Sequence, residues 1–328
     1  MLRLARLGLA LVLGGALLVA VAVAGLVQRA DSPGPAAEET TVTVPTGSGL
    51  AAIATRLAEA GVVDDPWLFR LYVRLRGMER ALTAGEYAFP AGVSAAEVAR
   101  MLRDHHVVQY RFTLVEGWTV AQTVAALRAE PDLTGELPEP PPEGSLLPDT
   151  YFFQRGESRA ELVARMRAAM EVELAAAWAE RAPGLPLESP EEALILASII
   201  EKETGVAAER DLVAGVFVNR LERGMRLQTD PTVIYALTGG EGPLDRALRR
   251  RDLEVEDPYN TYVHAGLPPG PIANPGRASI RAAVNPAATD YLYFVADGTG
   301  GHAFAETLAE HNANVRAWRR VQRQREDG

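Results

Sequence analysis

An uncharged apolar run near the N-terminus, from Leu7 to Val27, constrains this chain more than any other feature. As a helix rising about 1.5 Å per residue, the run is long enough to cross a hydrocarbon core of about 30 Å. Arg3 and Arg6 precede it, and positive charge on that side favours a cytoplasmic N-terminus. We therefore predict a cytoplasmic stub and a transmembrane anchor over residues 1–29.

The same segment can also be interpreted as a secretory signal peptide, because Ala22-Val23-Ala24 offers a small-residue cleavage site. The apolar run is longer than the hydrophobic region of a usual signal peptide, about 7–15 residues, which favours a retained anchor. Either interpretation exports the remainder of the chain. Residues 30–41, rich in Ala, Pro, Glu and Thr, are then predicted to form a short tether.

The composition excludes several classes of function. The net charge is −10, whereas a protein that binds nucleic acid presents a cationic face to the phosphates. The chain has no cysteine, so it cannot build a disulfide framework or a thiolate metal site. His264, His302 and His311 lie too far apart for a zinc motif, and no phosphate-binding or dinucleotide-binding motif occurs. We therefore expect no metal, no cofactor and no nucleic-acid partner.

A short pattern occurs three times after the tether. In each copy alternating apolar residues lead to a Gly, and a Leu follows ten positions later: Gly47 and Leu57, Gly92 and Leu102, Gly117 and Leu127. Alternation at period two is typical of a strand, Gly suits a tight turn, and the spacing to Leu suits an amphipathic helix. The pattern predicts three strand–turn–helix units within residues 42–143.

Small units of this kind are typical of modules that bind glycan chains, and the copies with a Pro-x-Gly turn resemble LysM repeats. A strand, a Gly turn and a helix are also common in α+β proteins in general. No residue in these units is specific for a sugar. Glycan binding and a role as a spacer or docking module therefore stay open as alternatives.

Residues 144–328 are predicted to form a larger catalytic domain of mixed structure. Its predicted elements are a strand at 151–153, helices over 159–179 and 210–223, and a hairpin formed by 291–295 and 301–304. The predicted fold class is therefore α+β, in which a transmembrane helix and LysM-like repeats precede a mixed α+β domain.

One helix of this domain has strong boundary signals. Ser189 is a suitable N-cap, Pro190 fits the first turn, and Glu192 stands three residues after the cap. Gly205 supplies a C-terminal stop. Residues 193–200 are apolar on every side of the helix, which indicates that the helix is buried.

Glu201 follows this apolar run directly. Low-dielectric packing penalises the ionised carboxylate, and the negative end of the helix dipole acts in the same direction. A carboxylic acid that stays protonated near neutral pH can act as a general acid on a glycosidic oxygen. The alternative is a surface Glu at a fraying helix end, paired with a basic side chain. Glu203, nearer the end of the helix, is expected to be an ordinary solvated residue.

Loops farther along the chain are dense in amide, hydroxyl and phenol groups, which can line a cleft and bind sugar hydroxyl and N-acetyl groups. The residues that we select as glycan contacts are Gln228, Asp230, Tyr235, Tyr259 and Asn260. Asp230 is also the best candidate for a second carboxylate beside Glu201. Simple turn and cap chemistry is the alternative for Asp230 and Asn260.

The sequence closely resembles the endolytic murein transglycosylases, the MltG or YceG-like family. The resemblance covers nearly everything after the anchor. Its main motifs are Leu196-Ala-Ser-Ile-Ile-Glu-Lys-Glu-Thr204, Gly224-Met-Arg-Leu-Gln-Thr-Asp-Pro-Thr-Val-Ile-Tyr235, Tyr259-Asn-Thr-Tyr262, Gly266-Leu-Pro-Pro-Gly270 and Tyr291-Leu-Tyr-Phe-Val295.

The resemblance implies a single-pass inner-membrane enzyme whose catalytic domain lies in the periplasm, with its catalytic glutamate at Glu201. The family cuts nascent peptidoglycan between N-acetylmuramic acid and N-acetylglucosamine, leaves a 1,6-anhydro-muramyl end and terminates strand elongation. Peptidoglycan synthases are the partners that it implies. A water-dependent muramidase and a non-catalytic wall-binding scaffold are the alternatives that we retain.

Overall fold

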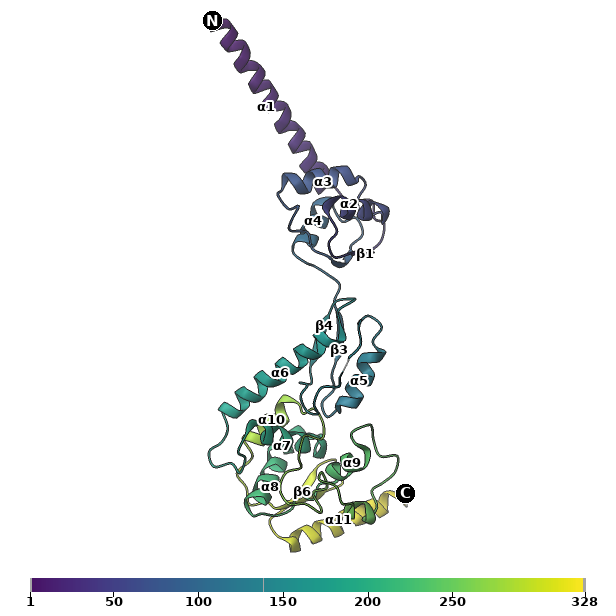
Figure 1. The fold of residues 1–328 in the computed structure, drawn as a ribbon, viewed down its shortest axis with the longest axis vertical. Coiled ribbons are helices and arrows are strands. Elements are labelled where there is room, and N and C mark those ends of the chain that lie inside the picture. The colour runs from purple at the N-terminus through teal and green to yellow at the C-terminus, as the bar shows by residue number, and fades with distance from the viewer. Residues whose placement is uncertain (1, 138, 327–328) are drawn as a thin grey trace. The chain divides into compact units, whose positions relative to one another are not determined.

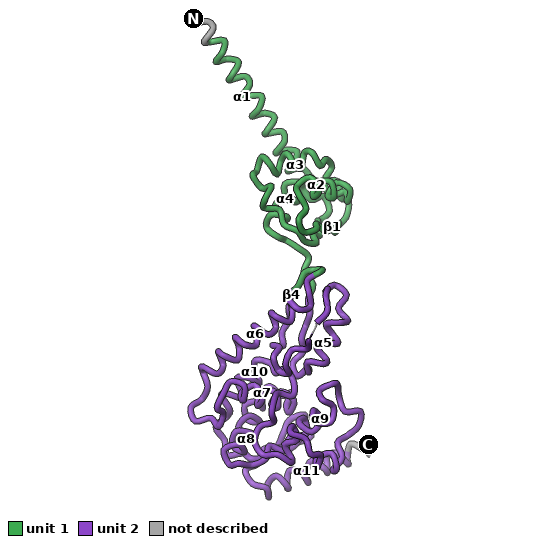
Figure 2. Tube along the Cα trace, viewed as in Figure 1, with its two compact units in different colours: residues 1–110, 153–156 green, residues 111–152, 157–328 purple. Residues whose placement is uncertain are grey.

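The fold is described from a computed structural model, which describes residues 2–137 and 139–326 (Figure 1). The chain divides into two compact units, shown in two colours in Figure 2. Unit 1 contains residues 1–110 and 153–156, and unit 2 contains residues 111–152 and 157–328. Both units contain helices and short strands, so the mixed α+β class is confirmed.

Unit 1 begins with a long apolar helix, α1 (Leu2–Asp31). Within the described part of the chain, this is the one helix that is long and apolar enough to cross a membrane. Its apolar side chains are exposed, with Leu11 at 72% and Leu18 at 73%. Such exposure suits a lipid environment and would be costly in water.

The rest of unit 1 packs around one hydrophobic core. Its elements are β1 (Thr40–Val44), α2 (Leu50–Glu59), α3 (Pro66–Leu75), β2 (Gly85–Phe89) and α4 (Ala95–Arg103). The two strands pair antiparallel, with Val42 opposite Tyr87. Phe69, Tyr87 and Phe89 are completely buried at the centre of this core.

The segment predicted as a tether is attached to unit 1. Ala30 is fully buried in the unit 1 core, and the Gly92 N–H donates to the Ala36 carbonyl at 2.8 Å. A Cβ on Gly34 would lie 2.3 Å from the Val93 carbonyl oxygen, so only Gly permits this close approach. The composition predicted a short tether. Backbone contacts, which composition does not encode, hold this segment against the rest of unit 1.

The three predicted strand–turn–helix segments are present. They are β1 with α2, β2 with α4, and β3 (Tyr110–Thr113) with α5 (Val120–Ala129). Each turn uses its Gly in the left-handed region, with φ of 80° at Gly47, 67° at Gly92 and 74° at Gly117. The third segment belongs mostly to unit 2, so the division of the chain falls at residue 110 rather than at 143.

Unit 2 is mainly helical and carries two short strand pairs. Besides α5, its elements are β4 (Thr150–Phe153), α6 (Arg159–Ala179), α7 (Pro190–Glu203), η1 (Ala207–Glu209), α8 (Arg210–Glu222), α9 (Asp230–Thr238), η2 (Arg250–Glu254), α10 (Arg277–Val284), β5 (Tyr293–Ala296), β6 (His302–Ala305) and α11 (Leu308–Glu326). β3 pairs with β4, and β5 pairs antiparallel with β6.

Helix α7 is the central element of unit 2. It packs against α6, α8, α9 and α10, and its residues from Leu196 to Ile200 are fully buried. The Ser189 hydroxyl accepts a hydrogen bond from the Glu192 N–H at 3.3 Å, as the sequence predicted for the helix start. The rigid core of the unit therefore fixes the last turn of α7, which carries Glu201, Lys202 and Glu203.

Candidate active site

Glu201 lies against the start of α10. Its Oε2 atom accepts a hydrogen bond from the Ser279 hydroxyl at 2.7 Å and another from the Gly276 N–H at 2.9 Å. Ser279 is fully buried, and Gly276 is the N-cap residue of α10. Two donors, one of them at the N-terminus of a helix, therefore hold the Glu201 carboxyl group against α10.

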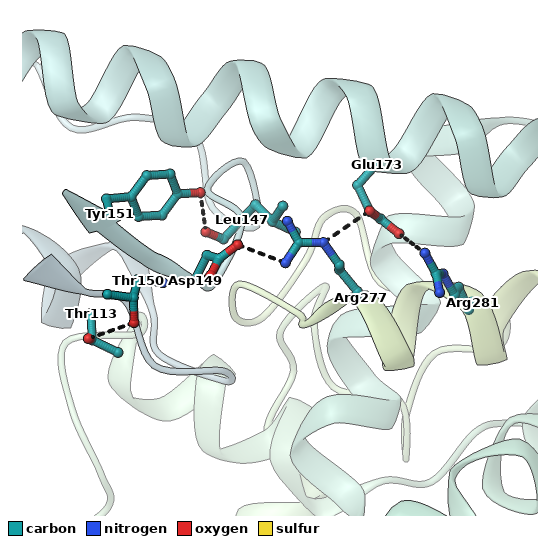
Figure 3. A network of polar contacts seen from close by, with 8 residues as sticks. All are labelled: Thr113, Leu147, Asp149, Thr150, Tyr151, Glu173, Arg277 and Arg281. Carbon is teal, nitrogen blue, oxygen red and sulfur yellow. Dashed lines mark hydrogen bonds and ion pairs between the residues drawn. The ribbon is translucent and has the colours of Figure 1, made fainter.

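Ion pairs hold this end of α10 in place (Figure 3). Arg277, the first residue of α10, pairs with Asp149 at 2.9 Å and with Glu173 at 3.1 Å, and Arg281 pairs with Glu173 at 3.2 Å. The two α10 arginines thus meet α6 and the segment before β4. The position of Glu201 is therefore fixed by a network that crosslinks three parts of unit 2.

Glu203 was expected to be solvated, and the structure contradicts this expectation. Its carboxyl group is buried, and the Thr229 hydroxyl donates a hydrogen bond to it. Thr229 is itself held by Thr261, whose hydroxyl accepts from the Thr229 N–H at 3.1 Å and lies 2.8 Å from the Thr232 hydroxyl. The last turn of α7 ends under the loop before α9, so Glu203 is covered although it closes its helix.

Burial raises the pKa of Glu203 from an ordinary 4.5 to about 7. Burial is the largest cause of this value; the negative charge of Asp230 acts in the same direction, whereas the Thr229 hydrogen bond, His302 and Arg220 lower the pKa. A carboxyl group with this pKa holds its proton at neutral pH in a large share of molecules. It can therefore donate that proton to a bound substrate.

Glu203 lines a cavity of about 430 Å³, which we call the Glu203 cavity. Arg220, Gln228 and Tyr262 contribute to its wall. Gln228 has a φ of 51°, a left-handed conformation that is uncommon for a residue with a Cβ atom. Backbone strain of this kind concentrates at functional sites, where the surrounding structure holds it.

A second cavity of about 470 Å³ is lined by Lys202, Thr119 and Tyr235, and we call it the Lys202 cavity. Asp230 lines both cavities, and its carboxylate accepts from the Tyr262 hydroxyl at 2.7 Å. Both volumes fall in the range of about 300–1,000 Å³ that is typical of ligand sites. Two cavities that share a wall residue suit an extended ligand better than a single small molecule.

The five predicted glycan contacts fall into three groups. Gln228, Asp230 and Tyr235 line the cavities. Tyr259 packs on Tyr235 with 4.7 Å between ring centroids, so it supports a wall residue. Asp230 is the first residue of α9, whose N-cap is Thr229, so the alternative of an N-cap role for Asp230 is wrong.

Asn260 does not face a cavity, and its selection as a glycan contact is wrong for this structure. The side chain is fully buried, and its amide donates to the Val255 carbonyl at 2.7 Å and to the Leu253 carbonyl at 3.2 Å. Its side-chain oxygen accepts from the Tyr262 N–H at 2.9 Å. Asn260 therefore uses its polar atoms to hold a loop.

We predict that Asn260→Ala lowers the free energy of unfolding of the protein by about 1–3 kcal/mol, because buried carbonyl groups lose their donors. Urea or thermal denaturation measures this change. Asn312→Ala, at an exposed position of α11, is the matched control and should stay within about 0.5 kcal/mol of wild type. An Asn260→Ala protein as stable as the control would contradict the structural role.

No cluster of three or more His, Asp or Glu side chains suited to a metal ion occurs within residues 2–137 and 139–326. The chemistry of the two cavities is therefore derived from the carboxyl, hydroxyl and basic groups that line them.

Comparison with known proteins agrees with this architecture. The model of the YceG-like family matches residues 42–317. The endolytic murein transglycosylase of Bacillus subtilis is 33% identical, over 92% of this chain and 89% of that protein. The protein of the same name from Streptococcus pneumoniae is 30% identical, over 84% of this chain and 57% of its own length.

A solved structure is also similar. The crystal structure of a YceG-like protein from Listeria monocytogenes shares 32% identity and a TM-score of 0.53, and the match covers 84% of this chain and 98% of that one. The family match extends through both units, from β1 into α11. This chain therefore belongs to the YceG-like family.

Proposed function

We propose that this protein is an endolytic murein transglycosylase, which cleaves the glycan strands of peptidoglycan within the chain. The names of its relatives support this activity. The observation that carries it is the position of Glu203, a carboxyl group with a pKa of about 7 in the wall of a cavity. Cleavage of a glycosidic bond requires such a proton donor.

We propose Glu203 as the catalytic acid, and Glu201, which the family resemblance implies, stays the alternative proposal. The sequence favoured Glu201 because it directly follows the apolar run of α7. In the structure, however, Glu201 is engaged by Ser279 and Gly276 and is not among the residues that line either cavity. Glu203 combines burial, a raised pKa and access to the Glu203 cavity. Those are the three properties that the reaction needs.

The reaction follows from one carboxyl group that acts twice. Glu203 donates its proton to the glycosidic oxygen as the bond from that oxygen to C1 of the muramyl sugar breaks. The C6 hydroxyl of the same sugar then attacks C1 while the Glu203 carboxylate accepts its proton. The products are a 1,6-anhydro-muramyl end and a new free hydroxyl group on the neighbouring sugar. Glu203 is protonated again at the end of the reaction.

Three wall residues are proposed to hold the strand. Gln228 offers an amide to hydroxyl or N-acetyl groups in the Glu203 cavity, and Tyr235 offers an aromatic wall in the Lys202 cavity. Asp230, between the two cavities, is placed to bind a sugar hydroxyl. We also propose that the strand–turn–helix segments of unit 1 are LysM-like and guide the strand.

The proposed location follows from α1. We propose that α1 is a retained, single-pass anchor in the inner membrane, with the N-terminus in the cytoplasm and the rest of unit 1 and all of unit 2 in the periplasm. An enzyme held at that membrane meets strands as they are made. Peptidoglycan synthases are therefore its proposed partners, and termination of strand elongation is its proposed outcome.

Hydrolysis by water is the second candidate, because Asp230 gives the Glu203 cavity a second carboxylate. Glycosidases that use water place two carboxyl groups across the bond. Mass spectrometry of the products from purified glycan strands distinguishes the two reactions. We predict anhydro-muramyl ends, which are lighter by one water than reducing ends. Products with only reducing ends would assign the protein to the muramidases instead.

A further inference from the structure

Lys202 is held at the wall of the Lys202 cavity with its charge uncompensated. Its Nζ atom donates to the Gly117 carbonyl at 3.2 Å, which leaves two of its three N–H groups for other acceptors. Among residues 2–137 and 139–326, no carboxylate forms an ion pair with this ammonium group. The cavity therefore contains a cation without a partner anion.

The loop that positions Lys202 is rigid. The Gly117 N–H donates to the Asn274 backbone carbonyl at 2.9 Å, and the Asn274 side-chain amide donates to the Trp118 carbonyl at 2.9 Å. Asn274 is completely buried, and its side-chain oxygen accepts from the Leu146 N–H at 3.0 Å. This support from the core of unit 2 fixes the carbonyl group that the exposed Lys202 side chain contacts.

The other cation of the Lys202 cavity is already paired with an anion. Arg246 is neutralised by Asp252, whose carboxylate it meets at 2.5 and 2.9 Å, and this pairing lowers the pKa of Asp252 to about 2. Asp230 is the remaining charged wall residue, and it is bound by the Tyr262 hydroxyl. Lys202 is thus the one free cation among the described residues of this wall.

We infer that Lys202 binds a carboxylate group of the glycan substrate in the Lys202 cavity. The inference rests on the proposed function, since a murein strand carries stem peptides with free carboxylates on alternate sugars. A chain of net charge −10 repels such a strand in general, so binding needs a local cation. One ammonium group among apolar and hydroxyl residues suits a single carboxylate, whereas a pyrophosphate needs several cations.

Lys202 and Glu203 are consecutive residues, yet they line different cavities with Asp230 between them. A strand whose carboxylate meets Lys202 therefore lies with its neighbouring glycosidic bond toward Glu203. Recognition of the carboxylate in this way selects murein over uncharged glycans. It also sets the register of the strand relative to the proposed acid.

The test compares two substrates. One is soluble, uncrosslinked murein glycan, and the other is the same material with its carboxyl groups converted to neutral amides by carbodiimide and excess ethanolamine. The full-length protein in detergent is used as wild type, Lys202→Ala, Lys202→Arg and Arg223→Ala. Arg223 is an exposed residue at the end of α8 outside both cavities, so its variant controls for the loss of one positive charge.

We expect amidation to lower kcat/KM of the wild type by about 10- to 100-fold, mainly through KM, as for loss of a charged hydrogen bond. Lys202→Ala should lose the same factor on the untreated strands and almost nothing more on the amidated ones. Lys202→Arg should keep most of the activity, and Arg223→Ala should behave as wild type.

Equal losses for Lys202→Ala on both substrates, or a wild type that is indifferent to amidation, would overturn the carboxylate site and leave the proposed function standing. Absence of cleavage of either substrate by the wild type would overturn the proposed function, and the carboxylate site with it.

Discussion

Glu203→Gln is expected to lower the rate of strand cleavage by about 10²–10⁴-fold while strand binding stays close to wild type. General acid–base catalysis contributes a factor of this size, and the proposed mechanism uses the same carboxyl group for both proton transfers. Gln has nearly the same shape and can still accept the Thr229 hydrogen bond, so the fold is retained. Release of soluble fragments from purified strands measures the rate, and sedimentation with insoluble murein measures binding.

Glu201→Gln is the matched control, since both residues lie in the last turn of α7. The amide oxygen of Gln can still accept from Ser279 and Gly276, but the charge that strengthens those bonds is lost. We expect about 1 kcal/mol less stability and cleavage within about tenfold of wild type. If this variant loses nearly all cleavage while Glu203→Gln stays active, Glu201 is the catalytic acid.

Stability should depend on pH through Glu203, with a definite sign. The folded protein holds the Glu203 proton up to about pH 7, whereas the unfolded chain releases it near 4.5. Between these values the folded state binds more protons, so the free energy of unfolding falls as pH rises. The stability that the proton provides is fully present below about pH 4.5 and is lost above about pH 7. The free energy of unfolding changes by up to about 3 kcal/mol over this range.

Glu203→Gln lacks this titration, so the variant should become more stable than wild type at pH 8 but not at pH 4. Urea denaturation of both proteins at the two pH values gives the difference. A site that gains stability when its acid is removed is typical of enzymes, which hold catalytic groups in unfavourable surroundings. A constant difference between the two proteins at both pH values would contradict the burial of this carboxyl group.

Local signals in the sequence predicted much of the fold. Helix α6 occupies the predicted range of 159–179, because Ser158 and Glu161 form a capping box at its start. Helix α7 begins at Pro190 as predicted, and it ends at Glu203, two residues before the expected Gly205 stop. Short-range chemistry between a cap and its first turn decides such boundaries.

Helices α9 and α10 were not predicted from the sequence. Helix α9 was expected to be loop, although Pro231 stands in its first turn and Gly239 ends it in the left-handed conformation. Helix α10 was also missed, and its position depends on ion pairs between Arg277 and residues far away in the sequence. Contacts of that kind cannot be read from a local pattern.

The choice between Glu201 and Glu203 could not be made from the sequence. Helix α7 is apolar on all sides, so periodicity does not say which face meets a cavity. Two residues two positions apart point to nearly opposite sides of a helix. The packing of α10 over one side and of the Thr229 loop over the other is the basis of our proposal for Glu203.

The central claim is that Glu203 keeps its proton near neutral pH, and its titration can be followed directly. Protein labelled with carbon-13 at the side-chain carboxyl of glutamate gives an NMR signal for Glu203, assigned by its absence in Glu203→Gln. We predict that this signal titrates with a midpoint near pH 7. A midpoint near 4.5, the ordinary value for glutamate, would contradict the account.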